Sequence, residues 1–536
     1  MQEQSTTKSF AILSLAGIAA KLLSLLYVPI LTRIIGDEGM GMYFKVYDIF
    51  VFIYAVTNVG MQTAISKYVA ELSALGNYKD AVRTFKISRA VLLVVGTVFT
   101  LIMMFGATSI AKFTGNPDIA YGLAFLSPAI LTTSILATYK GYFQGRNRMQ
   151  PVAIASVLEQ FANVVVSLVF AAILIKYGEQ LGSAGGTIGT SVGAVIAVIY
   201  LLYIYYVFKP EKEADMKQDA SVKRVSGKKI IKVLITYGLP ITLSSGLQNF
   251  GNVIDMANVN SRLIFAGFTQ ERATELYGLL GKWRTLINIP MVFITSLCIA
   301  ILPTLSKARV LNDRKEMENK INFSLRVTYF LSIPSAFGLA VLAKEVYNYL
   351  YGSPEGYLMM VVGSITIVLM AVVFVQNIIL QALNKFYFVV ATLVIGLVVK
   401  YFANYILVGN KNINIYGAVF GFILYFGLVF ILNNSEVRKV TKIKIKHMSL
   451  ISKPLIASIY MSIGIIALRW IINIFIKTQN LELFVGILYT LLLVVFGGAL
   501  YIQALLYMGA VNKEDIQSLS PKIYNKIPNR IKRYMK

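Results

Sequence analysis

The chain has 536 residues, of which 57% are hydrophobic, and its mean hydropathy is +0.68. Lysine and arginine outnumber the acidic residues by 51 to 25, which gives a formal net charge of +26. A soluble globular protein of this length would be far more polar, so we expect an all-α polytopic membrane protein. The single cysteine, Cys298, excludes an intramolecular disulfide. With one histidine, His447, and no recognisable catalytic or nucleotide-binding motif, the sequence favours a protein that is not an enzyme and needs no metal.

The first predicted element is a long apolar run, residues 9–34, with a lysine in its middle. Lys21 is flanked by Ala19, Ala20, Leu22 and Leu23, so it lies too deep to reach the interface easily. A charge at that depth costs about 2.5–3.5 kcal/mol on insertion scales. Lys21 could be neutralised by a carboxylate for packing alone. We favour a cation that faces a wet cavity and meets an anionic substrate.

Thirteen further runs follow, which makes about fourteen predicted transmembrane helices. The fourteen are 9–34, 46–66, 87–111, 119–139, 151–175, 183–208, 233–258, 280–305, 323–343, 357–381, 386–408, 415–433, 450–475 and 483–508.

The loop charges predict the orientation of these spans. With the N-terminus inside, 37 of the 51 basic residues fall in inner loops or tails and nine in outer loops, Lys45 among the nine. This asymmetry is the positive-inside pattern, and it places both termini in the cytoplasm. It also explains the high net charge through anionic lipid headgroups, without a nucleic-acid partner.

A short internal repeat divides the chain into two lobes. Residues 159–163 read EQFAN and residues 400–404 read KYFAN, and a span with glycines at four-residue spacing follows each. The predicted parts are an N-lobe (1–208, helices 1–6), a charged cytoplasmic linker (209–232), a C-lobe (233–433, helices 7–12), a basic loop (434–449), helices 13 and 14 (450–508) and a basic cytoplasmic tail (509–536).

Few other polar residues lie inside the predicted spans. Arg284 and Lys400 are basic, and Glu159 occupies the repeat position of Lys400 with opposite charge. A Glu159–Lys400 pair across the lobe interface would lower the insertion cost of both residues, either as a latch or as a purely structural pair. Asp255 shares a helix face with Gln248 and Asn252.

Together these residues resemble the MOP exporter superfamily, and within it the MurJ/YtgP/SpoVB group of lipid-linked oligosaccharide flippases. The resemblance covers nearly the whole chain. It rests on Lys21-Leu-Leu through Gly36, on Leu302-Pro-Thr-Leu-Ser-Lys307, on Leu325-Arg326 with Pro334-Ser-Ala336, and on Asn404-Tyr-Ile-Leu407 with Ile415-Tyr-Gly-Ala418. Tyr27-Val28 and Val51-Phe52 depart from the MurJ pattern, which points to the YtgP/SpoVB branch.

The resemblance implies two lobes around a cationic cavity, in which Lys21, Arg284 and Lys400 would hold the diphosphate of the substrate. It implies a multi-pass protein of the bacterial cell membrane that moves lipid II from the inner to the outer leaflet by alternating access, functional as a monomer. Helices 13 and 14 would form a groove for the lipid tail. Some members bind Na⁺ at residues matching Asp255 and Asn404, although Lys400 nearby would repel that ion.

Two alternatives stay open. The substrate could be another polyprenyl-linked polysaccharide or a spore-cortex precursor, or the protein could be a MATE-like multidrug or cation exporter, for which an acidic cavity would be expected. No cofactor is predicted. Because no ATP site exists, we expect energy from a Na⁺ or H⁺ gradient or from the membrane potential.

Overall fold

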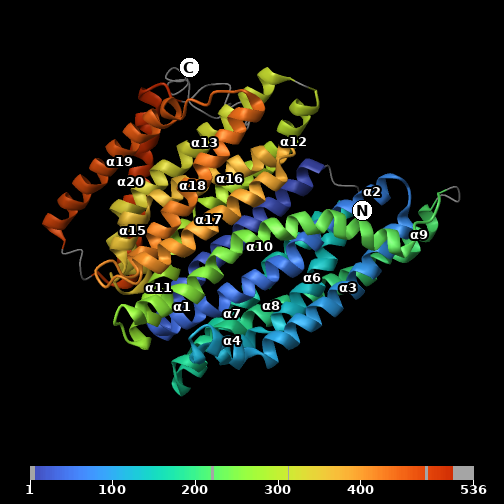
Figure 1. The fold of residues 1–536 in the computed structure, drawn as a ribbon, viewed down its shortest axis with the longest axis horizontal. Coiled ribbons are helices and arrows are strands. Elements are labelled where there is room, and N and C mark those ends of the chain that lie inside the picture. Colours follow the sequence, from blue (N-terminus) through green and yellow to red (C-terminus); the bar gives the residue numbers. More distant parts are fainter. Residues whose placement is uncertain (1–5, 219–221, 312, 477–480, 511–536) are drawn as a thin grey trace. The chain divides into compact units, whose positions relative to one another are not determined.

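The computed structural model describes residues 6–218, 222–311, 313–476 and 481–510, some of them, Lys21 included, by their backbone only. Within these ranges the chain is helical and has no strands, which confirms the predicted all-α class (Figure 1). Twelve helices in the described part are long and apolar enough to cross a membrane. The protein is therefore a multi-pass membrane protein.

The helices divide into two compact units, which are described separately. Unit 1 comprises residues 1–282 and 404–415, and unit 2 comprises residues 283–403 and 416–536. Helix α11 (Gln270–Ile287) and helix α17 (Phe386–Leu407) each contribute to both units. Unit 1 thus groups residues 233–282 with the N-terminal helices, whereas the sequence repeat assigned them to the C-lobe.

Unit 1 is built from helices, most of them long. They are α1 (Thr6–Tyr54), α2 (Gly60–Ala74), α3 (Tyr78–Phe105), α4 (Ala107–Phe113), α5 (Ala120–Leu126), α6 (Pro128–Gly145), α7 (Met149–Leu174), α8 (Glu179–Phe208), α9 (Pro210–Lys217), α10 (Gly227–Phe265) and most of α11, with short π or 3₁₀ turns at Ala55–Val59, Pro117–Ile119 and Ile175–Tyr177. An aromatic cluster joins α3, α6 and α8, in which the rings of Phe85, Tyr139, Tyr142 and Tyr205 lie 4.9–6.1 Å apart.

Unit 2 contains the remaining helices. They are α12 (Met291–Val310), α13 (Arg314–Val341), α14 (Ala343–Val346), α15 (Tyr357–Gly363), α16 (Ile365–Ala382), most of α17, α18 (Tyr416–Thr441), α19 (His447–Phe475) and α20 (Leu483–Tyr507), with a π turn at Tyr347–Tyr351. Helices α19 and α20, which match predicted helices 13 and 14, pack on each other and on α13. Arg469 of α19 forms an ion pair with Glu345 of α14 at 3.0 Å, which joins α19 to the rest of unit 2.

The expected count of fourteen spans differs from the twelve candidate helices at two places. The first two predicted spans fall in one helical stretch from Thr6 of α1 to Ala74 of α2, of which Leu26–Ala74 counts as one candidate span. It is kinked at Gly36, whose φ of 71° is left-handed. Predicted span 280–305 is divided between α11 and α12, with turns at 288–290 next to Pro290. The helix resumes directly after Gly36, so the placement of Lys45 in an outer loop was wrong: Lys45 lies on α1 and is fully buried.

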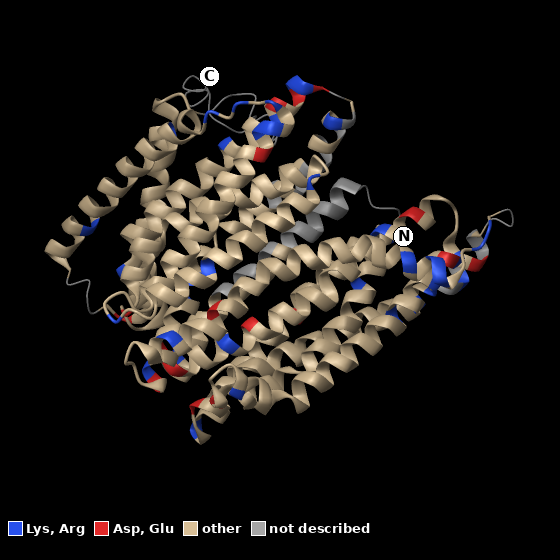
Figure 2. Cartoon of the chain, viewed as in Figure 1, with Lys and Arg blue, Asp and Glu red and all other residues tan. Residues whose placement is uncertain are grey.

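The charged linker 209–232 is attached to unit 1. It contains α9, and the buried carboxylate of Asp80 accepts hydrogen bonds from Arg224 Nε at 2.9 Å and from the Val225 amide at 2.6 Å. Lys79 adds an ion pair to Asp215 of α9 at 3.0 Å. Within each unit, most charged residues gather at the helix ends, and the middles of the helices are largely uncharged (Figure 2). This distribution suits a protein whose middle layer contacts lipid.

Candidate functional site

Two of the predicted substrate-binding cations are buried in unit 2. Arg284 on α11 is 7% exposed and Lys400 on α17 is 1% exposed. The Lys400 ammonium lies 3.6 Å from the centroid of the Phe422 ring, and Trp283 packs against the same ring at 5.3 Å. The face of an aromatic ring attracts a cation, by about 2 kcal/mol or more when the pair is desolvated. The fold therefore holds Lys400 against the ring of Phe422, with Trp283 on that same ring, within α17 and inside unit 2.

Lys21, the third predicted cation, lies on α1 in unit 1, and its side chain is outside the described residues. Its joint action with Arg284 on a diphosphate stays a prediction.

Glu159 has a different partner from the one predicted. Its carboxylate lies 2.7 Å from the ammonium of Lys140, so α7 and α6 are joined by a partly exposed ion pair inside unit 1. Lys400 belongs to unit 2, and the Glu159–Lys400 pair stays a prediction.

The two residues predicted as a possible ion site are in contact. Asn404 Nδ2 donates to Asp255 Oδ1 at 2.7 Å, and both residues are fully buried. Among the described residues, Asn404 Oδ1 has no hydrogen-bond partner. A carboxylate beside an unsatisfied amide oxygen supplies the hard oxygen ligands that Na⁺ prefers. No group of three or more histidine, cysteine, aspartate or glutamate side chains that could hold a metal occurs in the described part of the chain.

Sequence reasoning missed a polar contact surface between α1 and α11 in unit 1. Lys45 of α1 donates to Asn116, Asn260 and Thr274 at 2.7, 3.0 and 3.1 Å. On the same helix, Asp48 accepts from the Tyr277 hydroxyl at 2.6 Å, and Asp37 pairs with the buried Lys282. The missed signal was the spacing of Asp37, Lys45 and Asp48, which places them on one helix face once the chain is helical from Asp37 onward.

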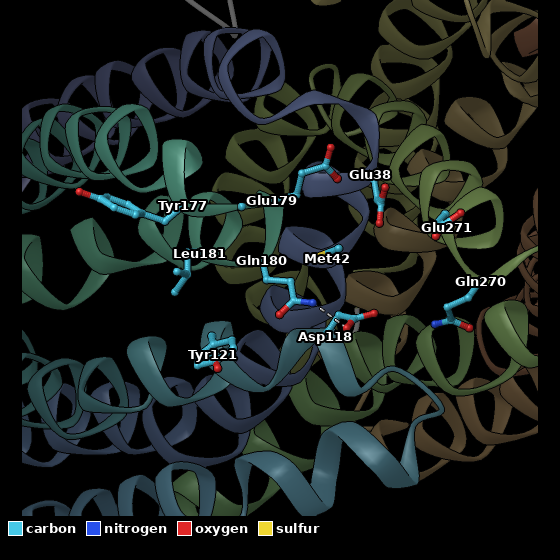
Figure 3. A pocket seen from close by; sticks show the side chains of 11 residues that line it. Glu38, Met42, Asp118, Tyr121, Tyr177, Glu179, Gln180, Leu181, Gln270 and Glu271 are labelled. Atoms are coloured by element: carbon cyan, nitrogen blue, oxygen red, sulfur yellow. Dashed lines mark hydrogen bonds between the residues drawn. The ribbon is translucent and has the colours of Figure 1, made fainter.

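Next to this surface lies a polar pocket of about 630 Å³ (Figure 3). Four carboxylates line it, from Glu38, Asp118, Glu179 and Glu271. Gln180 Nε2 donates to Asp118 Oδ1 at 2.8 Å across the pocket. The pocket belongs to unit 1 alone.

The comparisons with known proteins decide the family. A model of the polysaccharide biosynthesis protein family matches residues 6–309. The chain belongs to this family. Two proteins of Bacillus subtilis (strain 168) are similar to the chain over most of its length. Stage V sporulation protein B is 27% identical, over 83% of this chain and 86% of its own length. The lipid II flippase MurJ is 26% identical, over 94% of this chain and 95% of its own length.

A solved structure has a similar fold. An inward-facing multidrug resistance MATE transporter of the MOP superfamily has a TM-score of 0.66 and 16% identity, over 82% of this chain and 100% of that one. The predicted MOP exporter membership, of the MurJ/SpoVB type, is confirmed, as is the prediction of a transporter rather than an enzyme.

Proposed function

We propose that this protein is a flippase that moves a polyprenyl-diphosphate-linked sugar precursor from the inner to the outer leaflet of the bacterial cell membrane. The observation that carries the proposal is the pair of buried basic residues, Arg284 on α11 and Lys400 on α17, a helix long and apolar enough to span the membrane. A buried charge is expensive and marks a functional site by default. Arginine offers a planar fork of donors that suits phosphate oxygens, and lysine adds a point charge.

The substrate that we favour is lipid II. The MurJ relative, which is named a lipid II flippase, aligns over nearly the full length of both chains. Stage V sporulation protein B aligns almost as widely, so a precursor of spore-wall material is the alternative with the next strongest support. The positive-inside asymmetry supports an orientation with both termini in the cytoplasm.

A multidrug or cation exporter on the same fold is disfavoured by the charge of the buried residues. Cationic substrates call for acidic groups. The pocket of unit 1 has four carboxylates, but the two buried side chains predicted to bind the substrate are basic. Like charges across a binding site oppose binding, so Arg284 and Lys400 favour an anionic substrate.

Asp255 and Asn404 would be the residues that bind Na⁺ if a sodium gradient drives transport. The carboxylate of Asp255 and the unsatisfied Oδ1 of Asn404 would supply two oxygen ligands.

Complementation tests the proposal. A strain depleted of its own lipid II flippase should be rescued by the wild-type chain, and externally added lipid II-cleaving reagent should reach its substrate. Arg284→Ala and Lys400→Gln should lose rescue while the protein still accumulates in the membrane. Rescue by both variants at the wild-type level would contradict the cationic mechanism. If the chain instead restores drug resistance to a strain that lacks its drug exporters, and does not restore wall synthesis, the exporter is favoured.

A further inference from the structure

Helices α1 and α11 meet along a matched seam in unit 1. On α1 the facing residues are Asp37, Gly41, Lys45 and Asp48, spaced four, four and three apart. On α11 they are Gln270, Thr274, Tyr277, Gly278, Gly281 and Lys282, which share the corresponding spacing. Residues at these spacings lie on one side of a helix, so each helix presents one continuous stripe to the other.

Polar contacts occur along the length of the seam. Asp37 pairs with Lys282 at one place, and Asp48 accepts the Tyr277 hydroxyl at another. Lys45 donates to Thr274 between these positions along α1. Three separate side-chain pairs therefore fix the register of α1 against α11.

Glycines bring the two backbones into direct contact. A Cβ atom on Gly41 would lie 2.0 Å from the backbone oxygen of Thr274, and one on Gly278 would lie 2.4 Å from that of Asp37. No side chain larger than hydrogen fits at either position without a shift of the backbone. The seam is thus closed along its length.

Lys45 is the centre of this arrangement. It is fully buried, and its ammonium group has three acceptors: Asn116 before α5, Asn260 on α10 and Thr274 on α11. Thr274 donates its own hydroxyl hydrogen to the backbone oxygen of Gln270, so its oxygen is available to accept. An ammonium group has three donors, and all three are used. A buried charge with hydrogen bonds this complete is costly to disturb.

The Lys45 contacts also join segments that are distant in the sequence. Lys45 and Asn116 precede residue 208, whereas Asn260 and Thr274 follow the linker, in the part that the sequence repeat assigned to the second lobe. Gln270 strengthens the connection, because its Nε2 donates to Asn116 Oδ1 at 2.7 Å. One buried lysine therefore forms hydrogen bonds to residues from both sides of the linker, within unit 1.

We propose that the α1–α11 seam is a latch that holds this end of the transporter closed, and that Lys45 is the positioning residue that keeps it closed. The seam must separate and rejoin in each transport cycle. The proposal rests on the proposed function for its role in transport, but the closed seam itself can be measured without a substrate.

Labelling of a buried cysteine measures the opening of the seam. Ala273 is fully buried on α11, directly before Thr274 of the seam. In a Cys298→Ser background, Ala273→Cys should react slowly with a membrane-impermeant maleimide in vesicles. Adding Lys45→Met should raise the reaction rate about tenfold or more. The matched control Lys176→Met makes the same change at an exposed lysine and should leave the rate unchanged.

Thr274→Val gives a milder version of the same test. It removes one acceptor of Lys45 and should raise labelling by a smaller factor, and it replaces Lys45→Met if that variant does not accumulate. An unchanged labelling rate in the Lys45 or Thr274 variants would overturn the role of Lys45.

Cross-linking tests whether the seam opens during transport. A cleavable bifunctional thiol reagent should cross-link the cysteines of the Asp37→Cys, Lys282→Cys double variant. The cross-linked protein should stop transporting the lipid-linked precursor. Transport should return when the linker is cleaved by reduction. Full transport by the cross-linked protein would overturn the latch. If the wild-type chain moves no lipid-linked precursor while labelling still depends on Lys45, the proposed substrate fails and the closed seam stands.

Discussion

Four basic side chains are buried in the described part of this protein, and their surroundings differ. Lys45 has neutral acceptors, Lys282 has the carboxylate of Asp37, and Lys400 lies over the ring of Phe422. Arg284 follows Trp283 in the sequence of α11, and the Trp283 ring packs on that same Phe422 ring. Lys45 and Lys282 thus have polar partners in unit 1 that suit a structural contact, whereas Lys400 lies over an aromatic ring in unit 2.

At the residue scale, the ion pair of Glu159 gives a test that separates two partners. Glu159→Gln and Lys140→Gln should show a coupling of about 0.2–1 kcal/mol in a double-mutant cycle on thermal stability in detergent, because the pair is partly exposed. If Glu159 also pairs with Lys400 as predicted, Glu159→Gln and Lys400→Gln should each impair transport, and exchanging the charges of Glu159 and Lys400 should restore part of it. Additive effects of Glu159 and Lys400 on transport would leave Lys140 as the functional partner.

At the scale of elements, most helices could be predicted from hydropathy alone, because a membrane span needs a long apolar run and the loops between runs are short. The errors occurred where polar residues continue a helix. Lys45 was predicted to lie in an outer loop, since a charged residue usually ends an apolar run. The fold instead satisfies Lys45 with Asn116, Asn260 and Thr274, three residues distant in sequence. Such tertiary partners cannot be read from local composition.

The glycine contacts of the α1–α11 seam give a prediction at this scale. Gly41→Ala should destabilise the protein by about 1–3 kcal/mol, because the new Cβ would overlap the backbone oxygen of Thr274. The measurement is the thermal midpoint of the purified protein in detergent. Gly427→Ala is the control: nothing lies within 4 Å of that position on α18, so this variant should match the wild type or gain about 0.5–1 kcal/mol. Equal midpoints for the Gly41 and Gly427 variants would mean that the seam is not tightly packed.

At the scale of the whole molecule, the sequence predicted the fold class and the family, and the Asp255–Asn404 contact was anticipated only as a resemblance. The division into units was less predictable. Residues 233–282 follow the linker and were assigned to the C-lobe, yet they group in unit 1 with α1 and α2. A repeat reports how a chain duplicated, whereas packing depends on the conformation that the two copies adopt.

The orientation of the whole chain can be tested by cysteine accessibility. In a Cys298→Ser background, Lys223→Cys in the charged linker should react only after the membrane is permeabilised, because the excess of basic residues places this side in the cytoplasm. Ser353→Cys, between α14 and α15, should react in intact cells. The reverse pattern would invert the proposed topology.

Transport of a lipid-linked diphosphate in a purified system tests the central proposal most directly. The protein would be reconstituted into vesicles that carry fluorescent lipid II, and a membrane-impermeant quencher would report the headgroups that cross the bilayer. Wild-type protein should move them, Arg284→Ala and Lys400→Gln should each reduce the rate at least tenfold, and Lys344→Gln, a control outside the predicted substrate contacts, should retain the wild-type rate. Movement of lipid II at equal rates by all four proteins, or by none of them, would contradict a lipid II flippase that depends on these two buried cations.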